Sequence, residues 1–401
     1  MKRELYIVLA LTILACGTYG QTTKTGVLIV GDGNNAIGAG IQAAVSGVKT
    51  VVLLPGAGFE LSPLNQQLNS GIAAEFLKRL RASKGSKDST TVPSFDNAGA
   101  NAILKTWMDS LKNITVIRSM SWVKLRRSGS GWNLALKDGR TIKAEVLVNA
   151  DRSGKIDKEL SLERKQTILL PFNYENSSYR SSIAAVYSTK GRSASILSLY
   201  SLLNPMQENL IMLDPSAESL AAGQAAGGTG AYAVFFKQKT SAAHLKTIQG
   251  ELINYKLSLV PFSDVLNIDS NWKAIQFIGL TGILKAELSN ENAWFRPEQK
   301  VSAEEIRETI KSYFYKAQLW FDDYKEAQMT IGSTLDMISR VGSKSLKSTE
   351  EEVKKKWKTT YHFNTEFEAD REISRREFAV LVNEYLKPFD VNIDKTGRVI
   401  R

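Results

Sequence analysis

Residues 26–54 read GVLIVGDGNNAIGAGIQAAVSGVKTVVLL, and this stretch decides the fold of the chain. Residues 27–30 form a continuous apolar run, as is typical of a strand buried on both faces. A glycine-rich turn follows at 31–36, then a helix of small and apolar residues at 37–46 and a second apolar strand at 50–54. A strand, a helix and a strand in this order predict a right-handed β-α-β crossover, and therefore a parallel sheet.

The turn has the pattern Gly31-x-Gly33-x-x-Ala36 between a strand and a helix. In such a turn the first glycine permits the tight bend, and the second lets the backbone approach a pyrophosphate. Ala36 is small enough to keep the helix close to the strand. Because the first N–H groups of a helix are unpaired and its dipole favours anions there, the pattern predicts a dinucleotide-binding unit.

The acidic residue that usually ends the second strand of such a unit is absent. Leu54 stands in its place, Pro55 and Gly56 follow, and Glu60 is the nearest carboxylate. Losing a charge-assisted hydrogen bond to the ribose costs about 1.5–3 kcal/mol, or roughly ten- to a hundred-fold in affinity. We therefore expect nucleotide binding to be weakened but not abolished.

The remaining pattern predicts two domains, at 21–260 and 261–401. In the first we expect helices at 65–82, 98–111 and 218–236, strands at 115–117 and 142–148, and a hairpin formed by 121–127 and 132–136. Residues 160–215 give no clear assignment. From Pro261 onward the pattern is mostly helical.

The order of these segments resembles the FAD-dependent oxidoreductases of the glutathione-reductase-like flavoprotein group. The likeness rests on residues 27–54, the hairpin, residues 146–154 (VLVNADRSG) and the helix containing residues 222–227 (AGQAAG), and it spans about residues 24–260. It implies an α/β fold: an FAD/NAD(P)-binding, Rossmann-like, three-layer domain with a β-hairpin insert, followed by a mostly helical C-terminal domain.

The resemblance also implies FAD as the cofactor and a small molecule as the substrate. Val123 would offer backbone groups to the adenine, and the last helix would point its first residues at the isoalloxazine ring. The cofactor-binding residues it implies are Gly31, Gly33, Asn34, Ala36, Val123, Gly154, Gly223 and Gln224. No catalytic residue follows from it.

The chain departs from the family in three segments. Residues 59–62 (FELS) replace a Gly-Gly pair, residues 149–152 (NADR) replace Asp-Ala-Thr-Gly, and the 155–205 region, where the family builds its substrate domain, is short. The sequence is therefore compatible with two functions. The first is an exported FAD-dependent oxidoreductase that transfers hydride through the flavin. The alternative is a catalytically decayed flavoprotein scaffold that acts as a non-enzymatic cell-envelope protein.

The C-terminal region contains an internal repeat, because residues 294–306 align without a gap to residues 366–378. Each copy carries Ser and Glu at the spacing of a helix capping box. The repeat resembles S-layer homology modules, which implies docking on a cell-envelope polymer through a Ser-Arg-x-Glu motif. The arginine is missing in the first copy (Ala303) and present in the second (Arg375). A helical packing domain with no such partner is the alternative.

The first twenty residues read as a signal peptide. Lys2 and Arg3 precede an apolar run at 5–15, which is too short to span a bilayer. Cleavage before Gln21 gives an exported chain, periplasmic or associated with the cell envelope, with no transmembrane span. Acylation of Cys16 as a lipoprotein is the less favoured alternative.

Composition excludes several other classes of site. Cys16 is the only cysteine, so the mature chain has no disulfide and no cysteine–metal site, and the two histidines belong to no metal or triad motif. The net charge is +11, but the basic residues are scattered, and lysines at 354–358 follow glutamates at 350–352 as on a solvated helix. We therefore expect no metal and no nucleic-acid partner.

Overall fold

The structure is a computed structural model that describes residues 21–400 apart from 66, 87–90, 164–168 and 189–192. The predicted export segment, with Cys16, lies outside the described residues. Among the helices of the described part, none is both long and apolar enough to cross a membrane.

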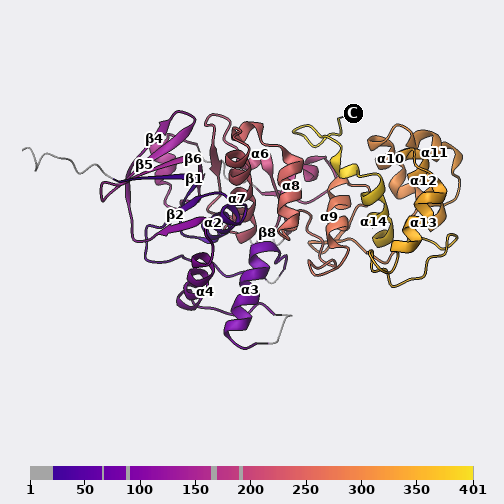
Figure 1. The fold of residues 1–401 in the computed structure, drawn as a ribbon, viewed down its shortest axis with the longest axis horizontal. Coiled ribbons are helices and arrows are strands. Elements are labelled where there is room, and N and C mark those ends of the chain that lie inside the picture. Colours follow the sequence, from indigo (N-terminus) through magenta and orange to yellow (C-terminus); the bar gives the residue numbers. More distant parts are fainter. Residues whose placement is uncertain (1–20, 66, 87–90, 164–168, 189–192, 401) are drawn as a thin grey trace, which may run out of the picture.

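A parallel sheet forms the centre of the N-terminal region (Figure 1). Its parallel strands are β1 (Thr22–Val30), β2 (Thr50–Leu53), β3 (Ile114–Ile117), β6 (Thr141–Asn149) and β10 (Leu210–Met212). The order is β3-β2-β1-β6, and β10 pairs with the carboxyl-terminal part of β6. The β-α-β unit predicted from residues 26–54 is therefore confirmed.

The sheet is covered on both faces, which explains the unbroken apolar run of β1. Val27 and Ile29 belong to a core shared with α2 (Asn34–Val45) and α7 (Leu220–Phe235). Leu28 and Val30 belong to a second core, shared with the hairpin of β4 (Trp122–Ser128) and β5 (Gly131–Leu136). The hairpin pairs antiparallel with β6. The expected three-layer domain with a hairpin insert is confirmed.

Two further helices, α3 (Gly71–Ser83) and α4 (Asn97–Asp109), lie on the helical side of the sheet. The predicted start of the first of them, at residue 65, was wrong. Gly71 has a φ of +54°, and its N–H donates to the carbonyl of Lys256. This contact ends an irregular segment before α3, and that segment forms one wall of the site described below.

Residues 160–215, unassigned from the sequence, contain all three strands of a second sheet. The antiparallel strands β7 (Leu169–Pro171), β9 (Ser193–Ser198) and β8 (Ser182–Ser188) pair in that order. The short helices around and after this sheet are α5 (Lys155–Glu159), η1 (Ser178–Ser181), α6 (Leu199–Leu202), η2 (Thr240–Ala242) and α8 (Leu245–Asn254). A cavity, described below, lies between this sheet and the first residues of α7.

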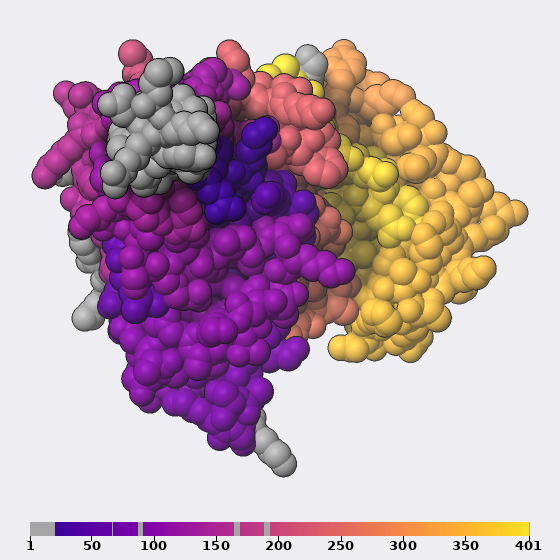
Figure 2. Space-filling view, turned by 60° about the vertical axis from the view of Figure 1, so that its left-hand side comes forward, coloured from indigo at the N-terminus to yellow at the C-terminus, as the bar shows by residue number. Residues whose placement is uncertain are grey.

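The C-terminal region is mostly helical, as expected, and packs directly on the α/β part (Figure 2). Arg180 of η1 donates to the carbonyls of Thr281 (3.1 Å) and Gly397 (3.2 Å) across this contact. Its elements are α9 (Trp272–Thr281), β11 (Glu287–Ser289), β12 (Asn292–Trp294), α10 (Ala303–Tyr313), α11 (Ala317–Asp323), α12 (Ile331–Gly342), α13 (Leu346–Lys356), α14 (Arg375–Tyr385) and η3 (Pro388–Asp390). The domain boundary at residue 260 stays a prediction.

The internal repeat has three members in the structure. Helices α10, α12 and α14 each begin with a reciprocal capping box. The residues before the caps form a closed ring, because Val301 N–H donates to Ile373 (3.1 Å), Ile373 N–H to Met329 (3.0 Å) and Met329 N–H to Val301 (2.9 Å). The middle member escaped the sequence comparison because its box is Thr330 with Ser333, without a glutamate.

Candidate dinucleotide-binding site

Gly31 occupies a position that only glycine can take. Its φ is +147°, and a Cβ there would lie 2.2 Å from the carbonyl oxygen of Ala150. Its N–H donates to Leu53, while Ala150 N–H donates to Val30. The turn is therefore closed between β2 and β6 at the carboxyl edge of the sheet, where nucleotides bind in folds of this class.

Gly33 is the N-cap of α2, and it has no side chain to satisfy the first N–H groups of the helix. The Glu218 carboxylate does this instead: Asn35 N–H donates to Glu218 Oε2 at 3.0 Å. A Cβ on Gly33 would lie 2.4 Å from the same oxygen. The space that the glycine leaves open, where a phosphate is expected, thus holds an acidic side chain from the loop before α7.

Glu218 is only partly satisfied in this position. Its Oε1 is buried and has no hydrogen-bond partner within the described part of the chain. Burial raises the pKa of Glu218, and Asp32 adds to the rise, whereas the Asn35 N–H bond and the Arg152 charge lower it. The carboxylate thus lies at a helix N-terminus that favours anions, but at a desolvation cost.

An ion pair spans the glycine turn beside Glu218. Arg152 donates from Nε (3.0 Å) and Nη2 (2.6 Å) to Oδ1 of Asp32. Arg152 belongs to the turn after β6, where the Asp151 carboxylate accepts from the N–H of Ser153 and Lys155. Gly154 ends this turn with a φ of +71° as the N-cap of α5. Gly154 lies between Ser153 and Lys155, two residues that line the cavity described next, and its part in cofactor binding stays a prediction.

The smaller cavity, of about 440 Å³, lies on one side of the glycine turn. It extends from Gly31 and Asp32 to the end of β2 and to the residues that enter the hairpin. Its hairpin wall consists of Met120, Ser121 and Trp122. Val123, predicted to meet the adenine, is the next residue and is exposed. Its contact with an adenine stays a prediction.

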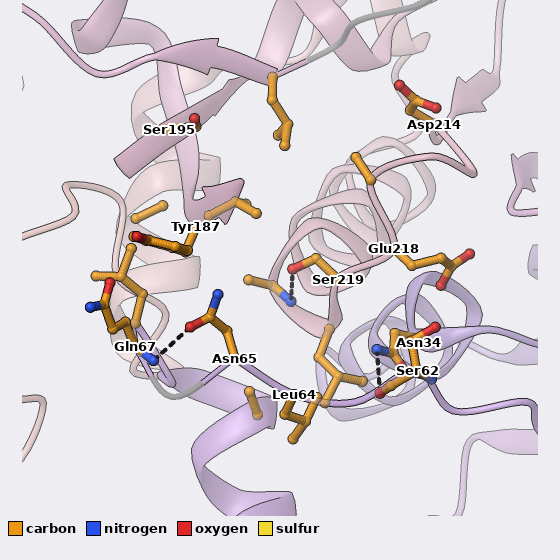
Figure 3. A pocket seen from close by; sticks show the side chains of 18 of the residues that line it. Asn34, Ser62, Leu64, Asn65, Gln67, Tyr187, Ser195, Asp214, Glu218 and Ser219 are labelled. Atoms are coloured by element: carbon orange, nitrogen blue, oxygen red, sulfur yellow. Dashed lines mark hydrogen bonds between the residues drawn. The ribbon is translucent and has the colours of Figure 1, made fainter. Parts of the chain in front are cut away.

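The larger cavity, of about 860 Å³, lies on the other side of the turn, between the Rossmann-like domain and the second sheet (Figure 3). Glu218 and Ser219 line it from the start of α7, and Tyr187 lines it from β8. Most of its polar lining is uncharged: Asn34, Ser62, Asn65, Gln67, Asn69, Tyr187, Ser193, Ser195, Ser216 and Ser219. Such a wall suits a ligand that forms many neutral hydrogen bonds.

Two buried asparagines at the start of α2 organise this edge. Asn34, a predicted site residue, exchanges two hydrogen bonds of 3.2 Å with the backbone of Ser62 and so holds the cavity wall. Asn35 donates to the carbonyl of Asp214 (3.2 Å) and accepts from Ser219 N–H (3.1 Å). Asn35 was not among the predicted site residues, although its place directly before Ala36 in the glycine pattern could have indicated it.

Gly223 and Gln224 have packing contacts in the structure. A Cβ on Gly223 would lie 2.2 Å from the carbonyl oxygen of Asn35, so this glycine lets α7 touch α2.

The fully buried Gln224 accepts from Ile72 N–H and donates to Gln42, both at 2.9 Å. Ala36 is fully buried in the core that contains Val27 and Ile29 of β1. The larger cavity is lined from α7 by Leu220 and Ala221, one turn earlier. Proximity of Gly223 and Gln224 to a flavin stays a prediction.

The arrangement leaves room for a dinucleotide such as FAD, except that the Glu218 carboxylate lies where its phosphates would bind. The two cavities flank the turn as the two halves of a dinucleotide require, and Gly31 and Gly33 leave its backbone open. A pyrophosphate on the α2 N-terminus would meet the Glu218 carboxylate. It fits when this side chain turns into the larger cavity, which it already lines. Leu54 is fully buried, so the missing ribose acid has no replacement at that position.

Among the described residues, the charged groups around these cavities form no metal site, and neither histidine lines a cavity. Within the described ranges, no group of three or more His, Cys, Asp or Glu side chains could hold a metal ion. His244 caps α8 through Thr247 N–H, and His362 is exposed. We therefore assign no catalytic acid or base.

The motif arginine of the C-terminal repeat is buried. Arg375 is 3% exposed, and its guanidinium pairs with Glu305 and donates to the carbonyls of Phe295 (2.7 Å) and Lys285 (2.6 Å). Its observed contacts therefore join repeat members to one another. Docking of the repeat on an envelope polymer stays a prediction.

No family model matches the chain, and no curated protein matches it. Solved structures with local similarity include Aquifex aeolicus GidA (17% identity, 31% of this chain, 25% of that chain, TM-score 0.24). AlpK is 13% identical over 52% of this chain and 62% of its own (TM-score 0.32). Thioredoxin reductase of T. acidophilum is 15% identical over 31% and 34% (TM-score 0.21). The chain thus spans less than two thirds of the length of each of these proteins.

Proposed function

We propose that the chain is an exported FAD-dependent oxidoreductase that acts on a small molecule. The observation that supports this most is the glycine turn at the carboxyl edge of the parallel sheet, with a cavity on either side. A dinucleotide needs two compartments joined by an anion-binding backbone. The smaller cavity would take the adenosine and the larger one the flavin together with the substrate.

The chain's own residues would bind and orient the cofactor. FAD, when bound, supplies the hydride chemistry. The N–H groups at the start of α2 would hold the phosphates, with Gly31 and Gly33 allowing close approach. The uncharged polar wall of the larger cavity would orient the flavin and a neutral substrate, and the second sheet would restrict the access of water. Export, and association with the cell envelope, belong to the same proposal.

Visible absorption of the purified mature chain tests the proposal. We expect added FAD to bind with a shifted oxidised-flavin spectrum and quenched flavin fluorescence. The affinity should be about ten- to a hundred-fold weaker than a site with the ribose acid would give. A protein whose addition leaves both the spectrum and the fluorescence of FAD unchanged at every concentration would reject the function, and it would favour the non-enzymatic scaffold.

The variant Gly33→Val tests whether FAD binds at the glycine turn. Gly33 has a φ of −88°, which any residue adopts, and the three atoms nearest to a Cβ there all belong to the flexible end of Glu218. The variant should therefore fold, yet its methyl groups occupy the phosphate position. We expect FAD binding to be lost while the far-UV circular dichroism stays unchanged.

A further inference from the structure

Glu218 takes the place of a ligand at the glycine turn. Its Oε2 accepts the Asn35 N–H at 3.0 Å and fills the space above Gly33. We propose that the Glu218 carboxylate is a built-in competitor of the nucleotide pyrophosphate, so that this one side chain sets the affinity of the site for dinucleotides. The proposal deepens the proposed function and rests on it for the identity of the ligand.

The backbone that carries Glu218 is fixed, so only a rotation of the side chain can move the carboxylate away from the turn. Asn35 holds this loop at both ends, through the Asp214 carbonyl and the Ser219 N–H. Ser219 in turn caps α7 through the N–H groups of Ala221 and Ala222. Because α7 begins immediately after Glu218, the loop cannot withdraw without separating α7 from α2.

A side-chain rotation is enough to free the turn. Glu218 lines the larger cavity of about 860 Å³, which has room for the displaced carboxylate. In its present position one oxygen is bonded and the other is buried without a partner within the described residues. A pyrophosphate offers more oxygens to the same N–H groups, and it can replace the carboxylate only by moving it.

Three other charged groups surround this position. Asp32 of the turn and Arg152 after β6 form an ion pair with each other, and Asp214 after β10 lies on the same cavity wall. Arg152 is therefore already committed to one carboxylate. Because Glu218 and Asp214 have no such basic partner in the part of the chain that the structure describes, acidic groups are in excess around the turn. Their charge repels an incoming pyrophosphate.

The test compares FAD binding by the wild-type protein, Glu218→Gln and Glu145→Gln. Glu145 is an exposed carboxylate on β6, so its variant loses the same charge away from the turn. Removing a repelling charge should tighten FAD binding by Glu218→Gln about ten- to a hundred-fold, as measured by flavin fluorescence quenching. Glu145→Gln should bind as the wild type does. Glu218→Ala serves as a second variant if the glutamine folds poorly.

The outcomes separate this inference from the proposed function. If the wild type binds FAD and neither Glu218 variant binds it more tightly, the inference is overturned and the function stands. If no variant binds FAD, the function fails, and titration with inorganic pyrophosphate decides the inference. Tighter pyrophosphate binding by Glu218→Gln supports it, and equal or weaker binding overturns it.

The same competition predicts a pH dependence. Burial raises the pKa of Glu218 above its ordinary value, so the carboxylate becomes neutral as the pH falls through that raised pKa. FAD affinity of the wild type should increase over this interval, whereas that of Glu218→Gln should change much less.

The raised pKa of Glu218 also affects stability. By linkage, ionisation of an acid whose pKa is higher in the folded than in the unfolded protein destabilises the folded state. The stability of the wild type relative to Glu218→Gln should therefore improve as the pH falls.

Discussion

Replacing Arg375 by methionine is expected to lower the free energy of unfolding by about 3–5 kcal/mol, the usual cost of removing one partner from a buried ion pair. The Arg375 guanidinium is buried and has three protein partners: the Glu305 carboxylate and the carbonyls of Phe295 and Lys285. Methionine keeps the packing of the side chain but leaves the two carbonyls and Oε2 of Glu305 without the arginine donor, while Oε1 of Glu305 still accepts the Ser302 N–H. Urea unfolding, followed by tryptophan fluorescence, measures the loss.

The partners of Arg375 explain the size of the effect. Burial raises the pKa of Glu305 and the charge of Arg375 lowers it, so the substitution should raise that pKa further. A second replacement, Glu305→Gln, removes the stranded charge, keeps an acceptor for the Ser302 N–H and should recover part of the lost stability. Arg340→Met is the control, because Arg340 pairs with Asp336 on the surface, where such pairs contribute about 0–1 kcal/mol. Equal losses for Arg375→Met and Arg340→Met would contradict a central role for Arg375.

Local patterns in the sequence predicted much of the fold. The β-α-β unit, the hairpin and the strand predicted at 142–148, which is β6, were all confirmed, because each depends on periodicity within a few residues. The second sheet was not predicted, since β7 has only three residues and β8 (SIAAVYS) and β9 (SASILS) show no sustained alternation of polar and apolar residues. Strand β10 of the first sheet was missed as well, because it too has only three residues. The middle member of the repeat was missed because its capping box is built by Thr330 and Ser333 instead of Ser and Glu.

The candidate site was predictable at its turn but not at its neighbours. Gly31 and Gly33 followed from a pattern that backbone geometry explains. The contact of Glu218 with this turn joins residues 183 positions apart, and no short motif encodes it. The same holds for Gln224, whose partners lie on α2 and α3. A glycine pattern thus shows where a phosphate could bind, but not which side chain competes for the place.

Gly223→Ala should be destabilising by about 3 kcal/mol, near the upper end of the usual cost of overpacking a core. The contact between α2 and α7 is backbone against backbone. A Cβ on Gly223 would lie 2.2 Å from the carbonyl oxygen of Asn35, and one on Gly227 would lie 2.3 Å from that of Ala39. Since backbone atoms cannot turn aside as a side chain can, the two helices would have to move apart.

Gly250→Ala is the matched control, because Gly250 lies inside α8 and a Cβ there meets no atom within 4 Å. The same substitution should stabilise the protein at that position by about 0.5–1 kcal/mol, through the higher helix propensity of alanine. Separation of α7 from α2 would also carry the Glu218 loop off the glycine turn. We therefore expect Gly223→Ala to lower the melting temperature and alter FAD binding together, and Gly250→Ala to raise the melting temperature alone. A Gly223→Ala protein as stable as the wild type would show that the helices do not touch through this glycine.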